Sequence, residues 1–137
     1  MSKPNAELTQ MEGLNVPVRT EKPWGHELLW ALTDRYAGKM LHVNAGQSLS
    51  LQYHREKDEW MYCLAGEAEL LLGEIWFRIG PGAAAHIPAG TIHRVRAVTD
   101  VDLVEVSSPE LDDIVRLADD YGRGTKAANG DPEESDD

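Results

Sequence analysis

The stretch GQSLSLQYHREKDEW (residues 46–60) predicts a strand with one polar face that runs into a charged turn. Successive side chains of a strand point to opposite faces, so its alternate polar residues share one face. These residues are Ser48, Ser50, Gln52 and His54. A barrel that turns such a face inward encloses a ligand cavity instead of a packed core. Its apolar outer face then needs cover, either from the N-terminal arm or from a second subunit.

Four side chains around this stretch predict a metal site. Gln52 and His54 lie two residues apart, and Glu59 begins the next strand after a short turn, so a hairpin can bring it beside them. Further on, the PAG turn at 88–90 places His93 at the start of another strand. One amide oxygen, two imidazoles and one carboxylate suit Zn²⁺, Mn²⁺, Fe²⁺, Co²⁺ or Ni²⁺. The open alternative is a polar cavity that keeps these residues without binding metal.

Short apolar runs punctuated by turns extend from Trp24 to about Ser107. The turns are marked by NAG, AG, GE, GPG, PAG and TD, and their even spacing predicts an all-β sandwich or barrel. The expected strands are Gly25–Leu32, Gly38–Val43, Ser48–His54, Glu59–Leu64, Ala68–Leu72, Ile75–Ile79, Ala84–Ile87, His93–Val98 and Leu103–Ser107.

The spacing of the apolar residues changes in SSPELDDIVRLADDYGR (residues 107–123), where Leu111, Ile114, Val115 and Ala118 recur at helical spacing. Ser108 suits an N-cap, Pro109 follows it, and three acids lie in the first turn. Gly122 can end the helix. The pattern therefore predicts a C-terminal α-helix over Pro109–Tyr121.

Composition limits the classes of function. The chain has 137 residues, which suits one domain, and a formal net charge of −11, which argues against nucleic acid as a partner. Residues 124–137 are polar, acidic and without periodicity, so we expect a disordered tail. The single cysteine, Cys63, is expected to be a small buried side chain. We find no segment typical of a membrane span or a secretory signal, and expect a cytoplasmic protein without a membrane partner.

Two spaced motifs resemble those of the cupin superfamily. Motif 1 is read from Gly46, Gln52, His54, Glu59 and Gly66, with Gln52 where the family usually has histidine. Motif 2 runs from Gly82 through PAG to His93. The resemblance implies a cupin fold, that is, a double-stranded β-helix or RmlC-like jelly-roll barrel, here with the C-terminal helix. The expected organisation is an arm over 1–20, a cupin domain over 21–123 and the tail over 124–137.

A narrower resemblance is to the C-terminal cupin domain of type II phosphomannose isomerases, which are often fused to a mannose-1-phosphate guanylyltransferase. It is carried by KPWG (22–25), LSLQYH (49–54), IPAG (87–90) and DDIVRLADDYGR (112–123). It departs from the family at Lys22, where those proteins usually carry arginine, and in the segment between His54 and Glu59. The guanylyltransferase domain has no counterpart in this chain, so synthesis of GDP-mannose is not attributed to it.

This resemblance implies a metal-dependent isomerase that interconverts mannose 6-phosphate and fructose 6-phosphate, or a related sugar phosphate. In those isomerases a Gln, two His and a Glu bind zinc, so the resemblance implies zinc here, acting as a Lewis acid for an enediol intermediate. The resemblance and the apolar outer face also imply a homodimer. Arg123 is expected to contact the substrate, with Lys39 as a weaker catalytic candidate. Lys22 and Trp24 are expected to line the cavity mouth, and no general base is evident.

Two other functions stay open at this point. One is a non-catalytic module that binds a sugar or a nucleotide sugar, and the other is a different cupin reaction such as epimerisation or dioxygenation. Among the remaining side chains, we expect hydrogen-bonded structural roles for His26, His42 and His86. Arg94 should pair with an acid. Trp60, Tyr62 and Trp76 should serve packing or an interface.

Overall fold

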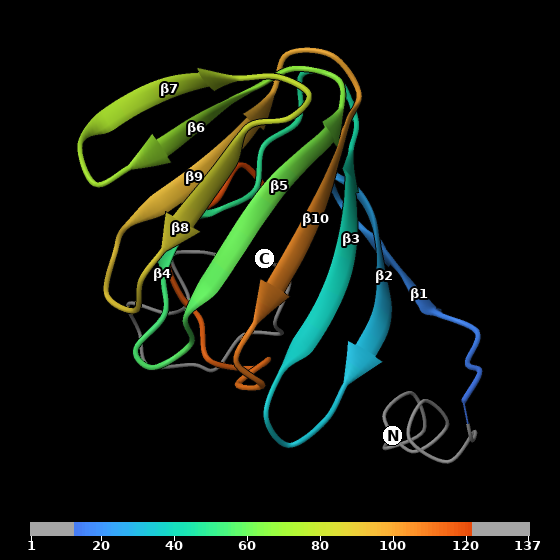
Figure 1. Cartoon of the computed structure of the whole chain (residues 1–137). Helices are drawn as coiled ribbons and strands as arrows, with labels where there is room; N and C mark the ends of the chain where they lie inside the picture. Colours follow the sequence, from blue (N-terminus) through green and yellow to red (C-terminus); the bar gives the residue numbers. More distant parts are fainter. Residues whose placement is uncertain (1–12, 122–137) are drawn as a thin grey trace.

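The computed structural model describes residues 13–121, which form two antiparallel β-sheets facing each other (Figure 1). The first sheet has six strands in the order β1-β2-β3-β10-β5-β8, and the second has five in the order β11-β4-β9-β6-β7. The all-β cupin arrangement predicted from the sequence is confirmed. The strands are β1 (Val18–Lys22), β2 (Gly25–Leu32), β3 (Ala37–Val43), β4 (Leu51–Tyr53), β5 (Glu59–Ala65), β6 (Ala68–Leu72), β7 (Ile75–Ile79), β8 (Ala84–Ile87), β9 (His93–Ala97), β10 (Val101–Ser107) and β11 (Val115–Ala118).

Two tight turns require glycine because another backbone passes close by. A Cβ atom on Gly25 would lie 1.9 Å from the carbonyl oxygen of His42, and one on Gly66 would lie 2.0 Å from that of Asp100. Both residues also have positive φ, which glycine adopts without steric cost. These contacts explain the glycines of KPWG and of the AG turn that follows β5.

The interior changes from polar to apolar along the strands. On β3 and β10 the facing pairs are Lys39 with Glu105, Leu41 with Leu103, and Val43 with Val101, and all six side chains are buried. The apolar end of the interior is completed by Trp24, Leu49, Met61, Cys63, Ala68, Leu70, Ile87, Val95 and Ala97. One barrel therefore contains a packed core at one end and a polar chamber at the other.

The start of β4 contains an irregularity that changes which side chains point inward. Ser48 pairs with Arg96, whereas Gln52 pairs with His93, so four steps on one strand face three on the other. One extra residue of this kind is a β-bulge, and it reverses the alternation of side chains that follow it. Leu49 can thus belong to the core while Gln52 also points inward. The predicted strict alternation over 48–54 is wrong at Leu49 for this reason.

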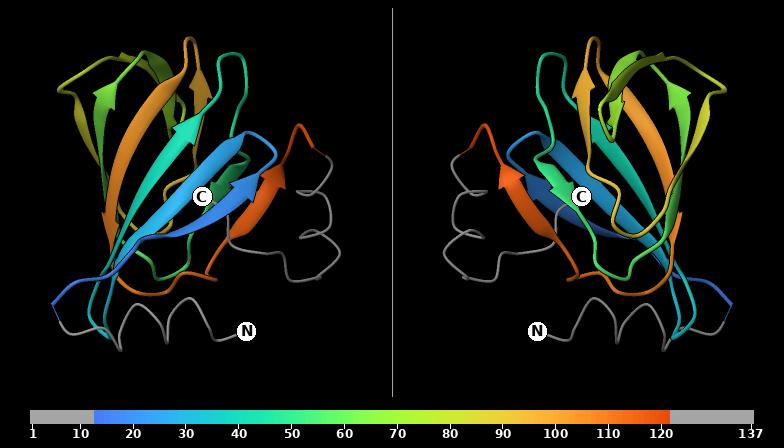
Figure 2. Two further views of the ribbon diagram at one scale, coloured as in Figure 1. Left: turned by 90° about the vertical axis from the view of Figure 1, so that its right-hand side faces the viewer. Right: turned by 90° about the vertical axis from the view of Figure 1, so that its left-hand side faces the viewer.

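The predicted C-terminal helix is wrong, because no helix occurs between residues 13 and 121. After β10 the chain crosses to the five-stranded sheet and forms β11 on its edge (Figure 2). Strand β11 pairs with β4, placing Arg116 opposite Gln52. A helix here would leave the backbone N–H and C=O groups of β4 without strand partners on that side. Hydrogen bonding to β4 therefore decides the structure, although the apolar residues are also spaced as in a helix.

The ends of the domain also differ in detail from expectation. Strand β1, which the sequence pattern did not predict, pairs with β2 and begins inside the expected arm. The expected acidic tail lies outside the described residues.

Cys63 is completely buried, and burial raises the pKa of its thiol, in agreement with a packing role. Within residues 13–121 we find no helix with the length and apolar character needed to cross a bilayer.

Candidate metal centre

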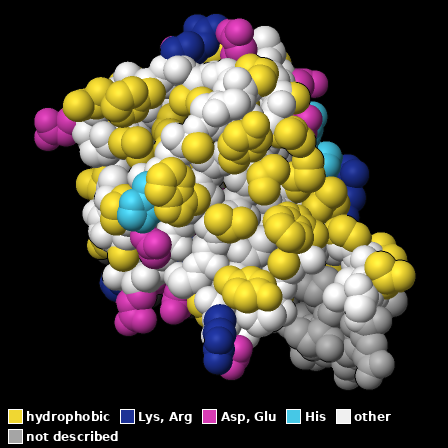
Figure 3. Space-filling model, viewed as in Figure 1, with side chains coloured by type: hydrophobic (Ala, Val, Ile, Leu, Met, Phe, Trp, Pro, Cys, Tyr) yellow, Lys and Arg dark blue, Asp and Glu magenta, His cyan; other side chains and the backbone are white. Residues whose placement is uncertain are grey.

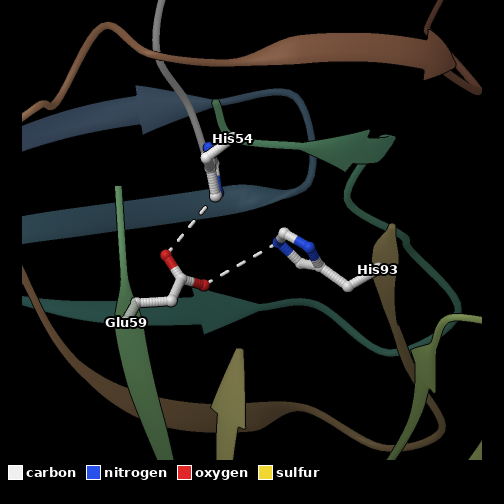
Figure 4. Close-up of side chains that lie close together, drawn as sticks. All are labelled: His54, Glu59 and His93. Carbon is white, nitrogen blue, oxygen red and sulfur yellow. Dashed lines mark ion pairs between the residues drawn. The ribbon is translucent and has the colours of Figure 1, made fainter. Parts of the chain in front are cut away.

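Three of the four predicted ligands meet in the polar chamber. His54 follows β4, Glu59 begins β5 and His93 begins β9, and one ligand atom of each lies within 4.8 Å of the others. The Nε2 atoms of His54 and His93 are 3.6 and 3.8 Å from the two carboxylate oxygens of Glu59 (Figure 4). Two ligands about 2.0–2.1 Å from one tetrahedral ion would be separated by about 3.3 Å, so this group could hold a divalent metal after small adjustments.

Both imidazoles are oriented by backbone carbonyl groups. Nδ1 of His54 lies 2.5 Å from the carbonyl oxygen of Asp113, and Nδ1 of His93 lies 2.8 Å from that of Thr91. A carbonyl oxygen can only accept, so Nδ1 carries the proton in each ring, and Nε2 is the ring nitrogen on the side of Glu59. Metal-binding histidines are commonly held in this way, by a hydrogen bond from the ring nitrogen that faces away from the metal.

Gln52 is positioned as the fourth predicted ligand. Its Cα lies opposite that of His93 in the sheet, and its side chain is buried. The amide nitrogen donates to Ser50 Oγ at 2.9 Å. Within the described part of the chain, Gln52 Oε1 and the carboxylate oxygens of Glu59 accept no hydrogen bond, although they are buried. Buried polar atoms without such bonds are uncommon, and coordination to a metal would satisfy these.

Charged residues that the sequence reasoning missed surround these ligands. Lys57 is completely buried, and its Nζ lies 3.2 Å from both Glu59 Oε1 and Glu105 Oε2. Arg116 is buried as well. The sequence carried a signal for Glu105, because it shares the inward face of β10 with Val101 and Leu103. It carried none for Lys57, since REKD (residues 55–58) has the composition of a solvated turn.

Asp113 was also missed, and it organises the turn between His54 and Glu59. Its carboxylate accepts hydrogen bonds from the backbone N–H groups of Arg55, Glu56 and Lys57, at 2.9, 2.6 and 2.9 Å. Burial alone would raise the pKa of this carboxyl. The three N–H donors outweigh burial and hold the pKa below its ordinary value.

The predicted catalytic and substrate residues fall in different places. Lys39 is buried in the polar chamber, with its Nζ 3.4 Å from Glu27 Oε1, and its catalytic role stays a prediction. Trp24 is completely buried in the apolar core, so the structure gives it a packing role and no place at the chamber. Lys22 ends β1 beside the turn to Gly25, at the level of Val43. Arg123 lies outside the described residues.

Several predicted structural roles are confirmed. His42 Nδ1 lies 2.6 Å from Asp102 Oδ1, and His86 Nε2 lies 2.7 Å from Asp58 Oδ1. His26 stacks on His42, with ring centroids 5.1 Å apart, and its expected hydrogen bond stays a prediction. Arg94 pairs with an acid as expected, since it donates to Asp120 at 2.7 Å.

The fold, the motifs and this site define the class of protein. Residues 39–108 match the cupin domain family, and the chain belongs to it. Two curated relatives resemble a larger part of the chain. A xanthan biosynthesis protein, XanB, of Xanthomonas campestris pv. campestris is 34% identical over 107 residues, and a mannose-1-phosphate guanylyltransferase of Escherichia coli K12 is 35% identical over 107.

Each of these matches covers 74% of the present chain, which spans about a quarter of the relatives' length, 23% and 22% respectively. The predicted resemblance to the cupin region of the bifunctional mannose enzymes is thereby confirmed. A solved structure supports the fold alone. The RmlC-like cupin from Shewanella frigidimarina superimposes with a TM-score of 0.67 at 14% identity, covering 72% of this chain and 92% of that one.

Proposed function

We propose that this cupin is a metal-dependent sugar-phosphate isomerase that interconverts mannose 6-phosphate and fructose 6-phosphate or a closely related pair. One observation carries the proposal. The buried oxygens of Gln52 and Glu59 accept no hydrogen bond within the described residues, and they share the chamber with two imidazoles. The similarity to a mannose-1-phosphate guanylyltransferase supports a mannose derivative as substrate.

Zinc suits this mixed nitrogen and oxygen set, and when bound it would supply Lewis-acid stabilisation of negative charge on substrate oxygens. The chain's own residues then have distinct tasks. Carbonyl groups hold both imidazoles with Nε2 inward, and Ser50 fixes the amide of Gln52. Lys57 fixes the carboxylate of Glu59.

The charges of the chamber favour an anionic substrate. Among the buried residues of the described part, the cations Lys39, Lys57 and Arg116 are balanced by the carboxylates of Glu27, Glu59 and Glu105. A divalent metal added to this balanced set leaves two positive charges in a region of low dielectric constant, where charge is costly. A phosphorylated sugar would bring the compensating negative charge.

A coupled assay tests the proposal. Protein loaded with zinc should convert mannose 6-phosphate to fructose 6-phosphate, lose this activity after complete chelation, and regain it when zinc is returned. His54→Ala should be inactive, whereas His86→Ala, which changes an exposed histidine outside the chamber, should stay active. Turnover that survives complete chelation, or none with any hexose phosphate, would contradict the proposal. Saturable sugar binding without turnover would instead favour the binding module.

We also propose that the outer face of the six-stranded sheet pairs with a second copy of the chain. Hydrophobic side chains gather on this face (Figure 3), and they include Trp60, Tyr62 and Val106, whose exposed fractions are 50%, 44% and 46%. They stand on the neighbouring strands β5 and β10, so the patch is continuous across the sheet. Large exposed apolar patches are typical of protein–protein interfaces.

Changing Tyr62 to glutamate should therefore separate the dimer, because the pairing would bury an unpaired charge. Sedimentation equilibrium should give twice the chain mass for wild-type protein and the single chain mass for the variant. Trp76→Glu is the matched control, since Trp76 is exposed to 43% but stands on the other sheet. A monomeric wild-type protein, or a dimer unaffected by Tyr62→Glu, would sink this proposal.

A further inference from the structure

The loop before β11 contacts the turn between His54 and Glu59 at two residues. Ser108 exchanges hydrogen bonds with Asp58, and Asp113 makes the larger set of contacts. Asp113 uses its carboxylate to accept three successive backbone N–H groups, those of residues 55–57, and its backbone carbonyl to accept from His54. Successive N–H groups that converge on one anion form a nest, which fixes the conformation of a short turn. Asp113 supplies that anion from 56 or more residues away in sequence.

This arrangement controls both ends of the turn between two predicted ligands. At one end, the carbonyl of Asp113 sets the tautomer and the rotation of the His54 ring. At the other end, the carboxylate fixes the backbone of Lys57, and the buried ammonium group of Lys57 lies 3.2 Å from the carboxylate of Glu59. Both ligands therefore depend on where Asp113 lies.

Strand β11 adds a second connection to the same centre. It begins two residues after Asp113, and it places Arg116 directly opposite Gln52 in the sheet. Further along, Asp120 accepts a hydrogen bond from Arg94, whose Nε donates to the carbonyl of Leu49 just before β4. The segment after β10 thus contacts β4 and the turn that follows it, and Arg94 links this segment to the carbonyl of Leu49.

We propose that Asp113 is a positioning residue of the metal centre, and that docking of residues 111–118 and binding of the metal stabilise each other. The inference rests on the metal site of the proposed function. If the docked segment raises the affinity for metal, bound metal must stabilise docking by the same free energy, since linkage is reciprocal. Loss of a group that orients a ligand typically weakens metal binding by about 10- to 100-fold.

Metal titration of three variants tests the proposal. Asp113→Ala should weaken zinc binding, measured by competition with a chromophoric chelator, by about 10- to 100-fold. Asp113→Asn should weaken it less, because the amide keeps one acceptor oxygen, and it also serves if the alanine variant does not fold. Asp112→Asn is the matched control, since Asp112 is an exposed neighbour, and its affinity should equal that of wild type.

Two readouts separate positioning from general stabilisation. Cobalt substituted for zinc should show an altered visible spectrum in Asp113→Ala, because the carbonyl of residue 113, which holds the His54 ring, is no longer kept in place by the carboxylate. Zinc should slow hydrogen exchange of the amides of residues 111–118 in wild type, and much less so in Asp113→Ala.

Unchanged affinity and spectrum in Asp113→Ala, with only a lower melting temperature, would overturn this inference alone. Wild-type protein that takes up no metal would overturn it together with the metal centre. An inactive wild type in which the Asp113 effects hold would remove the isomerase and leave the positioning role in place.

Discussion

Replacing Glu59 with glutamine is expected to abolish stable metal binding while the domain stays folded. Glu59 contributes the only carboxylate of the His54, Glu59 and His93 group, and both of its oxygens face an imidazole. Changes to the groups around metal ligands typically weaken metal binding by about 10- to 100-fold. Loss of the ligand itself should weaken zinc binding by more than this. Elemental analysis after dialysis and a zinc titration would measure this, and the rise of melting temperature with zinc should disappear.

The metal-free variant should remain folded because of the local charge balance. Lys57 lies between Glu59 and Glu105, so one buried cation serves two carboxylates. Neutralising Glu59 leaves the pair Lys57–Glu105 balanced. Glu56→Gln is the matched control, because Glu56 lies in the same turn but is exposed, and its zinc affinity should not change. A Glu59→Gln protein that keeps one tightly bound zinc would refute the assignment of this ligand.

Replacing Lys57 with methionine is expected to cause the largest loss of stability in the metal-free protein. Removing the shared cation takes an ion-pair partner from each of the buried carboxylates of Glu59 and Glu105, and breaking a buried ion pair in this way costs about 3–5 kcal/mol. Urea unfolding of the metal-free proteins would measure the difference. Zinc should then stabilise the variant more than it stabilises wild type, because the metal brings positive charge back beside Glu59.

A double-mutant cycle makes the cause of this loss explicit. Adding Glu105→Gln to Lys57→Met removes one of the two carboxylates that lost this cation, so it should restore part of the lost stability. Arg55→Met is the control in the same exposed turn, and it should change the free energy of unfolding by less than about 0.5 kcal/mol. Equal effects of Lys57→Met and Arg55→Met would show that the buried ammonium group carries no such role.

Strands that alternate regularly between turns could be predicted from the sequence to the residue. This holds for β2, β6, β7 and β8, where the apolar period and the glycine turns agree. Strand β11 could not be predicted, because its residues also fit helical spacing and only the open edge of β4 decides between the two. The bulge before β4 is equally invisible, since it exists only relative to β9.

The candidate site likewise contains residues that could be predicted from the sequence and residues that could not. Gln52, His54 and Glu59 could be predicted because one strand and the turn after it bring them close in sequence, and the PAG turn marks His93 as the start of another strand. The groups that hold these ligands in place could not be predicted in this way, since Asp113 reaches the turn from a segment 56 or more residues further along the chain. Lys57 reads as a surface residue until Glu105, 48 residues away, is placed beside it.

The change of the interior from apolar to polar separates stability from chemistry within one barrel. Leu41, Leu103 and their neighbours supply hydrophobic burial at one end, and this offsets the cost of collecting charges at the other. Substitutions near His93 can therefore change the candidate metal centre without touching the apolar residues that pack between the sheets. A scaffold of this kind should tolerate variation of the polar half, provided that the buried ion pairs of Lys57 are kept.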